Sequence, residues 1–134
     1  MNQALSLIFE TTLSQTDVNP CYNRLLIPFK KLIRDDFLTP DETRILEEEE
    51  EDEEINNDEA MGVGAILVDH RNQKWGVILK RREVKKDIWT YALICGWNDI
   101  VKANGLKDGD YISLRVFRHR GILCFDLDPR LALS

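Results

Sequence analysis

The sequence has few of the residues on which metal, redox or disulfide sites are built. Its three cysteines, Cys21, Cys95 and Cys124, form no Cys-x-x-Cys pair and cannot all pair with one another, so neither a disulfide framework nor a zinc site is predicted. The two histidines, His70 and His119, stand in predicted surface turns without a third ligand at suitable spacing. No cofactor is therefore expected, and unpaired cysteines favour a reducing compartment, the cytosol or the nucleus.

Long hydrophobic runs and catalytic patterns are missing as well. No apolar run approaches the roughly 20 residues that span a bilayer, and no charged-then-apolar leader opens the chain. We therefore expect a soluble protein that is neither secreted nor in a membrane. No glycine-rich phosphate loop follows a predicted strand, and Asp108 and Asp110 lie in a Lys-Asp-Gly-Asp turn without a partner nucleophile. Because these patterns are missing, we expect that the protein is not an enzyme and has no small-molecule substrate.

Acidic residues are abundant, but they are concentrated in one segment. Of the 24 acidic residues, 14 lie between positions 35 and 59, where Arg44 is the one basic residue. That segment carries a net charge of −13, and the rest of the 134-residue chain carries +7. Eight consecutive acids at 47–54 repel one another and lack the spaced oxygens and glycine of a calcium loop. The sequence thus predicts a solvated, disordered loop over about 41–60, attached to a mildly basic folded body.

Outside this segment, short apolar stretches alternate with turn residues. About seven strands are predicted, over residues 5–13, 24–27, 62–69, 74–80, 89–94, 111–118 and 122–128. The first two are expected to form a hairpin with a long polar tip, and 74–80 is expected to pair with 89–94 across a basic tip. Trp75 and Trp97 stand in apolar surroundings and are predicted to lie in the core.

Two short helices complete the predicted order of elements. Pro28 starts one, with Phe29 and Leu32 at helical spacing. The other follows the corner at Gly96, where Asn98 is expected to cap its amino end. This order predicts a small, mainly β protein with a plug helix, and the length suits a single domain over 1–134.

These landmarks resemble the plant-specific B-three DNA-binding domain of auxin-response, abscisic-acid-insensitive and reproductive-meristem transcription factors. The resemblance covers about 9–127, and the acidic loop is its main departure. Its most specific part is Gly96-Trp97 followed by Leu106-Lys-Asp-Gly-Asp110. A Gly-Val-Gly-Ala stretch in the third strand is similar to a divergent branch of the family. The resemblance implies a seven-stranded open β-barrel, the DNA-binding pseudobarrel, with two short α-helices, in a nuclear protein of transcriptional regulation.

The resemblance also implies two hairpin arms that clamp double-stranded DNA in its major groove. Residues 14–24 form the first arm, 80–89 the second, and 95–98 a corner near the DNA backbone. Arginine and lysine can neutralise phosphates, and asparagine and glutamine can read adenine. The candidate DNA-binding residues are Ser14, Gln15, Asn19, Asn23, Arg24, Lys80, Arg81, Arg82, Lys85, Lys86, Trp89 and Asn98.

Other roles stay open for several of these residues. The cations at 81, 82, 85 and 86 are the strongest candidates, because they repel one another unless an anion is near. Arg24 could equally pair with Asp17, and the asparagines could serve turn geometry. Trp89 could cover the hairpin instead of contacting DNA.

Two functions also stay open for the whole chain. One is DNA binding, sequence-directed or nonspecific. The alternative is a protein-interaction module on the same fold, with other transcriptional proteins as partners and weak or lost DNA binding. The acidic segment suits this alternative, because it could occupy the basic tip as a tethered polyanion and compete with DNA.

Overall fold

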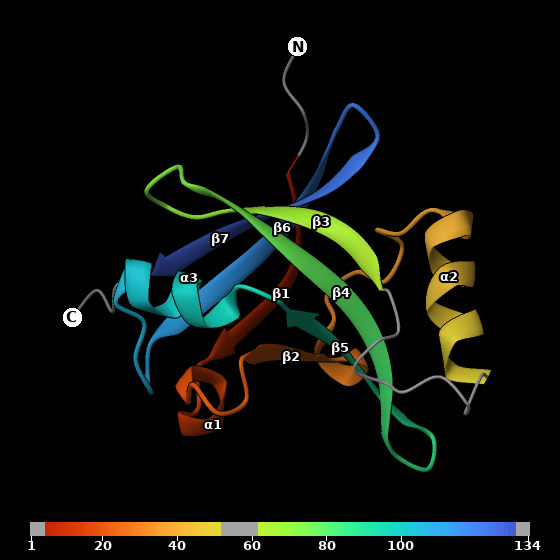
Figure 1. The fold of residues 1–134 in the computed structure, drawn as a ribbon, viewed down its shortest axis with the longest axis horizontal. Helices are drawn as coiled ribbons and strands as arrows, with labels where there is room; N and C mark the ends of the chain where they lie inside the picture. The colour runs from red at the N-terminus through yellow and green to blue at the C-terminus, as the bar shows by residue number, and fades with distance from the viewer. Residues whose placement is uncertain (1–4, 52–61, 131–134) are drawn as a thin grey trace.

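A seven-stranded sheet organises the computed structural model, which describes residues 5–51 and 62–130 (Figure 1). Its strands, in chain order, are β1 (Ser6–Thr12), β2 (Arg24–Pro28), β3 (Val63–Val68), β4 (Lys74–Lys85), β5 (Ile88–Ile94), β6 (Tyr111–His119) and β7 (Ile122–Arg130). The spatial order is β1-β6-β7-β3-β4-β5-β2. Neighbours are antiparallel except β3 and β7, which run parallel. The mainly β prediction with seven strands is confirmed, and the sheet is open because β1 and β2 form its two edges.

Alternation along the strands builds the core. In β4, Val77 and Leu79 are buried while Lys74 and Gly76 are exposed, which is the pattern of a strand with one face inward. Trp97 is fully buried, and Trp75 packs against the same core cluster. Both tryptophans therefore have the structural role that the sequence predicted.

The helices differ more from the prediction. The structure has α1 (Gln15–Val18), the 3-10 helix η1 (Phe29–Lys31), α2 (Pro40–Glu51) and α3 (Trp97–Asn104). The two expected helices correspond to η1 and α3, while α1 and α2 were not predicted. The prediction that Asn98 caps α3 is wrong, because the N-cap is Gly96 at φ 86° and Asn98 lies inside the helix. No helix in the described ranges is long and apolar enough to cross a membrane.

The predicted hairpin of the first two strands is also wrong. Strand β1 pairs with β6 and β2 pairs with β5, so the two lie at opposite edges of the sheet. The chain leaving β1 is held at Leu13, whose N–H donates to Asp110 O at 2.7 Å and whose O accepts from Gly109 N at 2.8 Å. Helix α1 then carries the chain towards the other edge.

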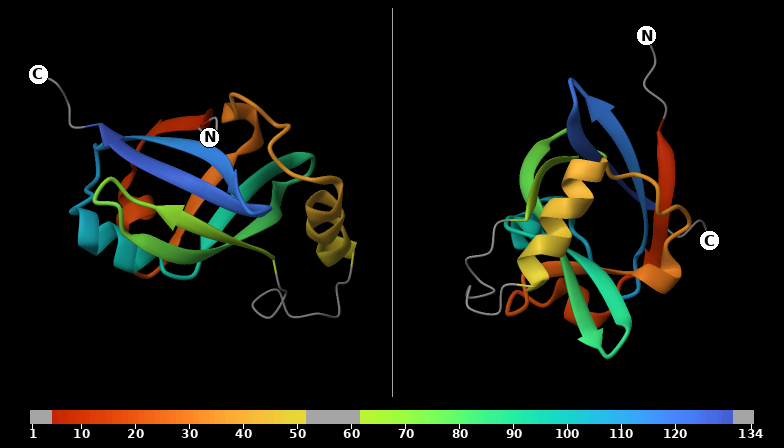
Figure 2. Two further views of the ribbon diagram at one scale, coloured as in Figure 1. Left: turned by 90° about the horizontal axis from the view of Figure 1, so that it is seen from above. Right: turned by 90° about the vertical axis from the view of Figure 1, so that its right-hand side faces the viewer.

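The prediction of a disordered loop over 41–60 is wrong for residues 41–51, which belong to helix α2. Its start is a capping box, in which Thr39 N donates to Glu42 Oε1 at 2.9 Å and Glu42 N donates to Thr39 Oγ1 at 3.2 Å. Pro40 suits the first helical position, and Leu46 is buried in the core cluster. The helix lies beside β4 (Figure 2). Positions 52–60 of the expected loop lie outside the described residues.

Candidate nucleic-acid interface

The second arm is the hairpin of β4 and β5. Its ladder runs from Ile78 opposite Ile94 to Lys85 opposite Ile88, with a bulge between Glu83 and Lys85. The two strands therefore extend further than the sequence predicted, and only two residues, 86 and 87, form the turn. Asp87 closes it in the left-handed region at φ 63°. A narrow two-stranded ribbon thus projects beyond the sheet (Figure 1).

Three cations occupy the end of this ribbon. Arg82, Lys85 and Lys86 are exposed, and none of their side chains has an ion pair or hydrogen bond within the part of the chain that the structure describes. Of the two acidic residues nearby, Glu83 accepts a hydrogen bond from the backbone N–H of Asp87 at 3.3 Å. The β4–β5 tip, residues 82–88, therefore presents a net positive charge to solvent.

The other two basic candidates of this arm lie inward. Lys80 is buried at 5% exposure. The Arg81 guanidinium carbon stacks 4.1 Å from the centroid of the Trp89 ring and 5.6 Å from that of Phe29. In addition, Arg81 Nη1 is 3.9 Å from Glu47 Oε1 of α2. Trp89 and Arg81 together form a platform at the base of the tip.

Polar side chains of the first arm stabilise its own turns. Ser14 caps α1, because its N–H donates to Asp17 Oδ2 at 2.8 Å while its Oγ accepts from Asp17 N at 3.3 Å. Asn19 Oδ1 accepts from Cys21 N at 2.9 Å, which is an Asx turn. Asn19 thus has the turn role that the sequence left open for it, and Ser14 has a capping role that the sequence analysis did not predict.

Two further asparagines join the first arm to α3. Asn98 N donates to Asn23 Oδ1 at 2.8 Å, and Asn98 Nδ2 donates to Pro20 O at 2.9 Å. Asn23 adopts φ 48°, a left-handed conformation that asparagine tolerates better than most residues. Together with the bond from Trp97 Nε1 to Asp17 O at 2.7 Å, these contacts hold the arm against the corner at 95–98.

Gln15 and Arg24 are the first-arm candidates least involved in such contacts. Gln15 is exposed on α1. The Arg24 guanidinium carbon lies 4.8 Å from the centroid of the Tyr22 ring, and its Nη1 is buried without a hydrogen-bond partner. The alternative pairing of Arg24 with Asp17 does not form within the described chain.

Both arms project from one side of the molecule. Helix α1 and the β4–β5 tip lie along the lower side in Figure 1 and in the right-hand view of Figure 2. Strands β2 and β5, which pair over Arg24–Pro28, lie between them. The fold therefore brings 14–24 and 82–88 to the same side, although they are far apart in the sequence.

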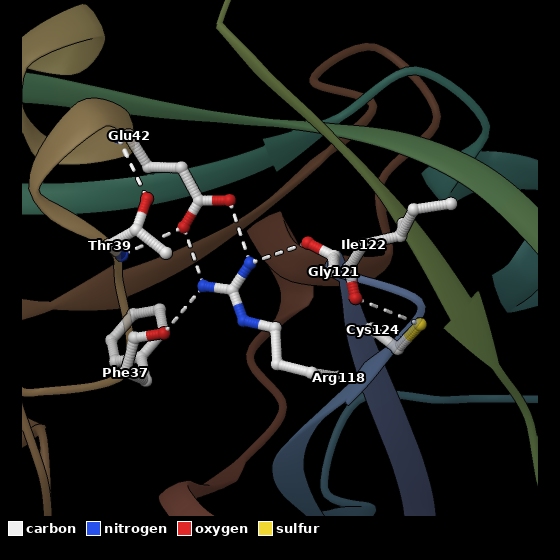
Figure 3. A network of polar contacts seen from close by, with 7 residues as sticks. All are labelled: Phe37, Thr39, Glu42, Arg118, Gly121, Ile122 and Cys124. Carbon is white, nitrogen blue, oxygen red and sulfur yellow. Dashed lines mark hydrogen bonds and ion pairs between the residues drawn. The ribbon is translucent and has the colours of Figure 1, made fainter.

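A polar cluster that the sequence did not predict fixes α2 on the sheet (Figure 3). Arg118 donates to both carboxylate oxygens of Glu42, at 2.8 and 2.5 Å, to Phe37 O at 3.0 Å and to Gly121 O at 3.3 Å. Burial alone would raise the pKa of Glu42, but hydrogen bonds from Arg118 and Thr39 hold that pKa below its ordinary value. The Thr-Pro-Asp-Glu capping box was the sequence signal that predicts this helix start.

A second buried carboxylate shapes the turn before β4. Asp69 Oδ2 accepts from Trp75 Nε1 and Asn104 Nδ2, each at 3.0 Å, and Oδ1 accepts from the N–H groups of Arg71 and Gln73, each at 2.9 Å. Although burial opposes ionisation, these bonds hold the pKa of Asp69 below its ordinary value. Every oxygen is used internally, so this carboxylate is structural.

Comparisons with known proteins identify the family. A family model described as B3 domain-containing protein At2g31720-like matches residues 1–130. In Arabidopsis thaliana, the B3 domain-containing protein At3g25182 is 60% identical over 128 residues, which are 92% of this chain and 36% of that protein. The B3 domain-containing protein At5g24050 is 58% identical over 126 residues, 91% of this chain and 35% of that protein. The chain spans about a third of the length of these relatives.

Solved structures share the fold. The Arabidopsis FUS3-DNA complex matches with a TM-score of 0.57 at 19% identity, over 94% of this chain and 98% of that one. The Arabidopsis thaliana transcription factor LEC2-DNA complex matches with a TM-score of 0.55 at 18% identity, over 93% and 95%. With seven strands in this arrangement and a family model that matches nearly the whole length, the chain belongs to the B3 domain-containing proteins, in the group similar to At2g31720.

Proposed function

We propose that residues 1–134 form a single, non-enzymatic B3 domain that binds double-stranded DNA in a nuclear regulator of transcription. The observation that carries this proposal is the β4–β5 tip, where Arg82, Lys85 and Lys86 are exposed and close together. Like charges on one turn repel one another, and a phosphate backbone relieves that repulsion while releasing counterions. The fold shared with FUS3 and LEC2, which were solved as DNA complexes, supports the same function.

The shape of the second arm suits the major groove. A two-stranded β ribbon fits the groove of B-DNA, which is about 12 Å wide. The Trp89 and Arg81 platform stiffens the base of the ribbon, because the guanidinium lies 4.1 Å from the ring. In this proposal the cations of the tip contact phosphates, and the ribbon brings its end to the base edges.

The first arm contributes a second contact from the same side. Gln15 is exposed and can bond to base edges or phosphates, and Arg24 stands at the base of the arm. Ser14, Asn19 and Asn23 act indirectly in this proposal, by setting the conformation of the arm. Asn98 holds it against α3.

A second function is favoured by the position of α2. The Glu47 carboxylate, 3.9 Å from Arg81, shows that an acidic protein segment can lie beside the second arm. A protein-interaction module would use the same arm to bind an acidic partner. The acidic helix would also compete with DNA for this arm, so α2 would weaken DNA binding at low salt.

The two functions are separated by fluorescence anisotropy on the full chain. A pool of random DNA duplexes and a polyglutamate of similar length are titrated at about 50 to 200 mM salt. For a domain that contacts six or more phosphates, duplex affinity falls about a thousandfold over this range, and the duplex is bound more tightly than polyglutamate at each salt concentration. A folded protein that binds polyglutamate as tightly as DNA, or that binds no duplex, supports the interaction module instead.

A further inference from the structure

The β4–β5 tip exposes two large apolar side chains among its charges. Val84 is 59% exposed and Ile88 is 50% exposed. Neither belongs to the core cluster or to the partly buried side chains packed against it. Packing in the core therefore does not explain why these two positions are apolar. Their side chains form apolar surface at the projecting end of the arm.

The local geometry places both residues at the outer end of the ribbon. Ile88 is opposite Lys85 in the last pair of the ladder, and Val84 lies in the bulge between Glu83 and Lys85. A bulge inserts an extra residue into one strand and redirects its side chains. It adds an apolar residue to the same end of the hairpin that carries Arg82, Lys85 and Lys86.

The surrounding charge identifies the class of ligand. A tip with three cations attracts a polyanion. The apolar residues of the tip then contact the apolar groups on the surface of that polyanion. In the major groove, the apolar group on a base edge is the C5-methyl of thymine, which aliphatic side chains can contact. The positive tip thus brings Val84 and Ile88 to a surface on which methyl groups mark A·T pairs.

We propose that Val84 and Ile88 contact thymine methyl groups and give this domain a preference for thymine at the position that the second arm reaches. This inference rests on the proposed DNA binding and adds a source of sequence selectivity to it. Each methyl group removed from water against an aliphatic side chain changes affinity by about fourfold. The cations supply the affinity that is common to all sequences.

The test uses two pools of duplexes that differ only in the methyl group, one with thymine and one with deoxyuracil at the same positions. The full chain is titrated with both pools by fluorescence anisotropy. We expect tighter binding to the thymine pool, by about fourfold for one methyl contact and about sixteenfold for two. The double variant Val84→Ser/Ile88→Ser should bind both pools equally.

Two further variants serve as controls. Leu5→Ser/Ile122→Ser removes two exposed apolar side chains, 51% and 45% exposed, outside the arms, and should keep the thymine preference. The single variant Ile88→Thr keeps a β-branched residue in the strand and should lose part of the preference, which guards against misfolding of the double variant.

The possible outcomes distinguish failure of the methyl contact from failure of DNA binding. Equal binding of the wild type to both pools, with normal salt dependence, overturns the methyl contact and leaves DNA binding intact. A thymine preference that survives in Val84→Ser/Ile88→Ser also overturns it, because other residues then read the methyl group. Failure of the folded wild type to bind either pool overturns both proposals and assigns the tip to a protein partner.

Discussion

The polar candidate residues of the two arms are used in opposite ways. In the first arm, Ser14, Asn19 and Asn23 all form hydrogen bonds within the chain. In the second, Arg82 and Lys85 reach solvent without a partner in the described structure. The hydrogen-bonding groups of the first-arm candidates are thus already used by the fold, whereas the cations of the second arm are available to a ligand.

The same difference indicates that the first arm contributes mainly to the free energy of unfolding and the second mainly to the free energy of DNA binding. Bonds such as Asn98 N to Asn23 Oδ1 link segments that are 75 positions apart, so they contribute to the stability of the fold. The exposed cations contribute little to folding, because surface charges are screened by water and salt. Changes in the first arm should therefore alter unfolding, and changes in the tip should alter binding.

Reversal of the tip charges should have the largest effect. Lys85→Glu/Lys86→Glu changes the charge of the tip by four units and should weaken duplex binding by about a hundredfold or more at 0.15 M salt. Both residues are exposed, so the midpoint of urea unfolding should move little. Anisotropy and urea titrations measure the two quantities, and a loss in affinity below about threefold contradicts the proposed role of the tip.

In the first arm, Asn23→Ala should act on stability instead. The substitution leaves Asn98 N without its acceptor and puts alanine at φ 48°, which together cost about 2 kcal/mol in the free energy of unfolding. Asn23→Gly tolerates that φ and should cost about 1 kcal/mol. Urea denaturation measures both values. If Asn23→Gly instead weakens DNA binding strongly while stability is unchanged, Asn23 reads DNA directly.

The cluster at Arg118 should make α2 sensitive to acid. Because the folded pKa of Glu42 is lower than its unfolded value, the stabilisation is present above the unfolded pKa and is lost as pH falls through the folded pKa. Glu42→Gln should cost about 1 to 2 kcal/mol at neutral pH and flatten the decline in stability below about pH 4.5. Unfolding by urea from pH 3 to 7 checks this. An unchanged acid profile in Glu42→Gln contradicts the assignment.

The smallest effect is expected where α2 meets the second arm. Glu47→Gln should strengthen duplex binding by about twofold at low salt, because a half-exposed ion pair at 3.9 Å is worth only about 0.5 kcal/mol. Asp35→Asn removes the same charge from an exposed position outside α2 and serves as the control. Equal gains from both variants would show an effect of net charge alone, without competition by the helix.

Local patterns predicted the sheet better than its connections. Alternation located β4 and the pair β6 and β7, because burial of one face leaves a clear period in the sequence. The pairing of β1 with β6 could not be predicted in the same way, since it depends on the contacts of Leu13 with the turn at 107–110. For α2, the prediction of a loop rested on the eight consecutive acids alone, whereas the helix has a capping box at Thr39 and buries Leu46 in the core cluster.

The sequence indicated which residue types belong to the candidate site, but it could not indicate how buried or exposed each of those residues is. Lys80 and Arg82 are both basic and lie on the same face of β4, yet Lys80 is buried within the sheet while Arg82 is exposed where the ribbon projects beyond it. The sequence predicted that the strand ends at residue 80 and that Arg82 lies in the basic tip, so the burial of Lys80 beneath the longer ribbon could not be predicted. The exposure of Val84 and Ile88 could not be predicted either, because it depends on how β4 and β5 pair at the end of the hairpin.

The central claim is that the tip binds DNA through its charges, and the salt dependence of affinity tests it most directly. Two doubly substituted variants remove equal charge, Lys85→Gln/Lys86→Gln at the tip and Lys74→Gln/Arg120→Gln at exposed positions. Lys74 begins β4 and Arg120 lies in the β6–β7 turn, and in Figure 1 both of these segments lie away from the tip. The slope of log affinity against log salt should become shallower by about 1.8 in the tip variant and stay unchanged in the control. Equal slopes in the two variants would contradict the account.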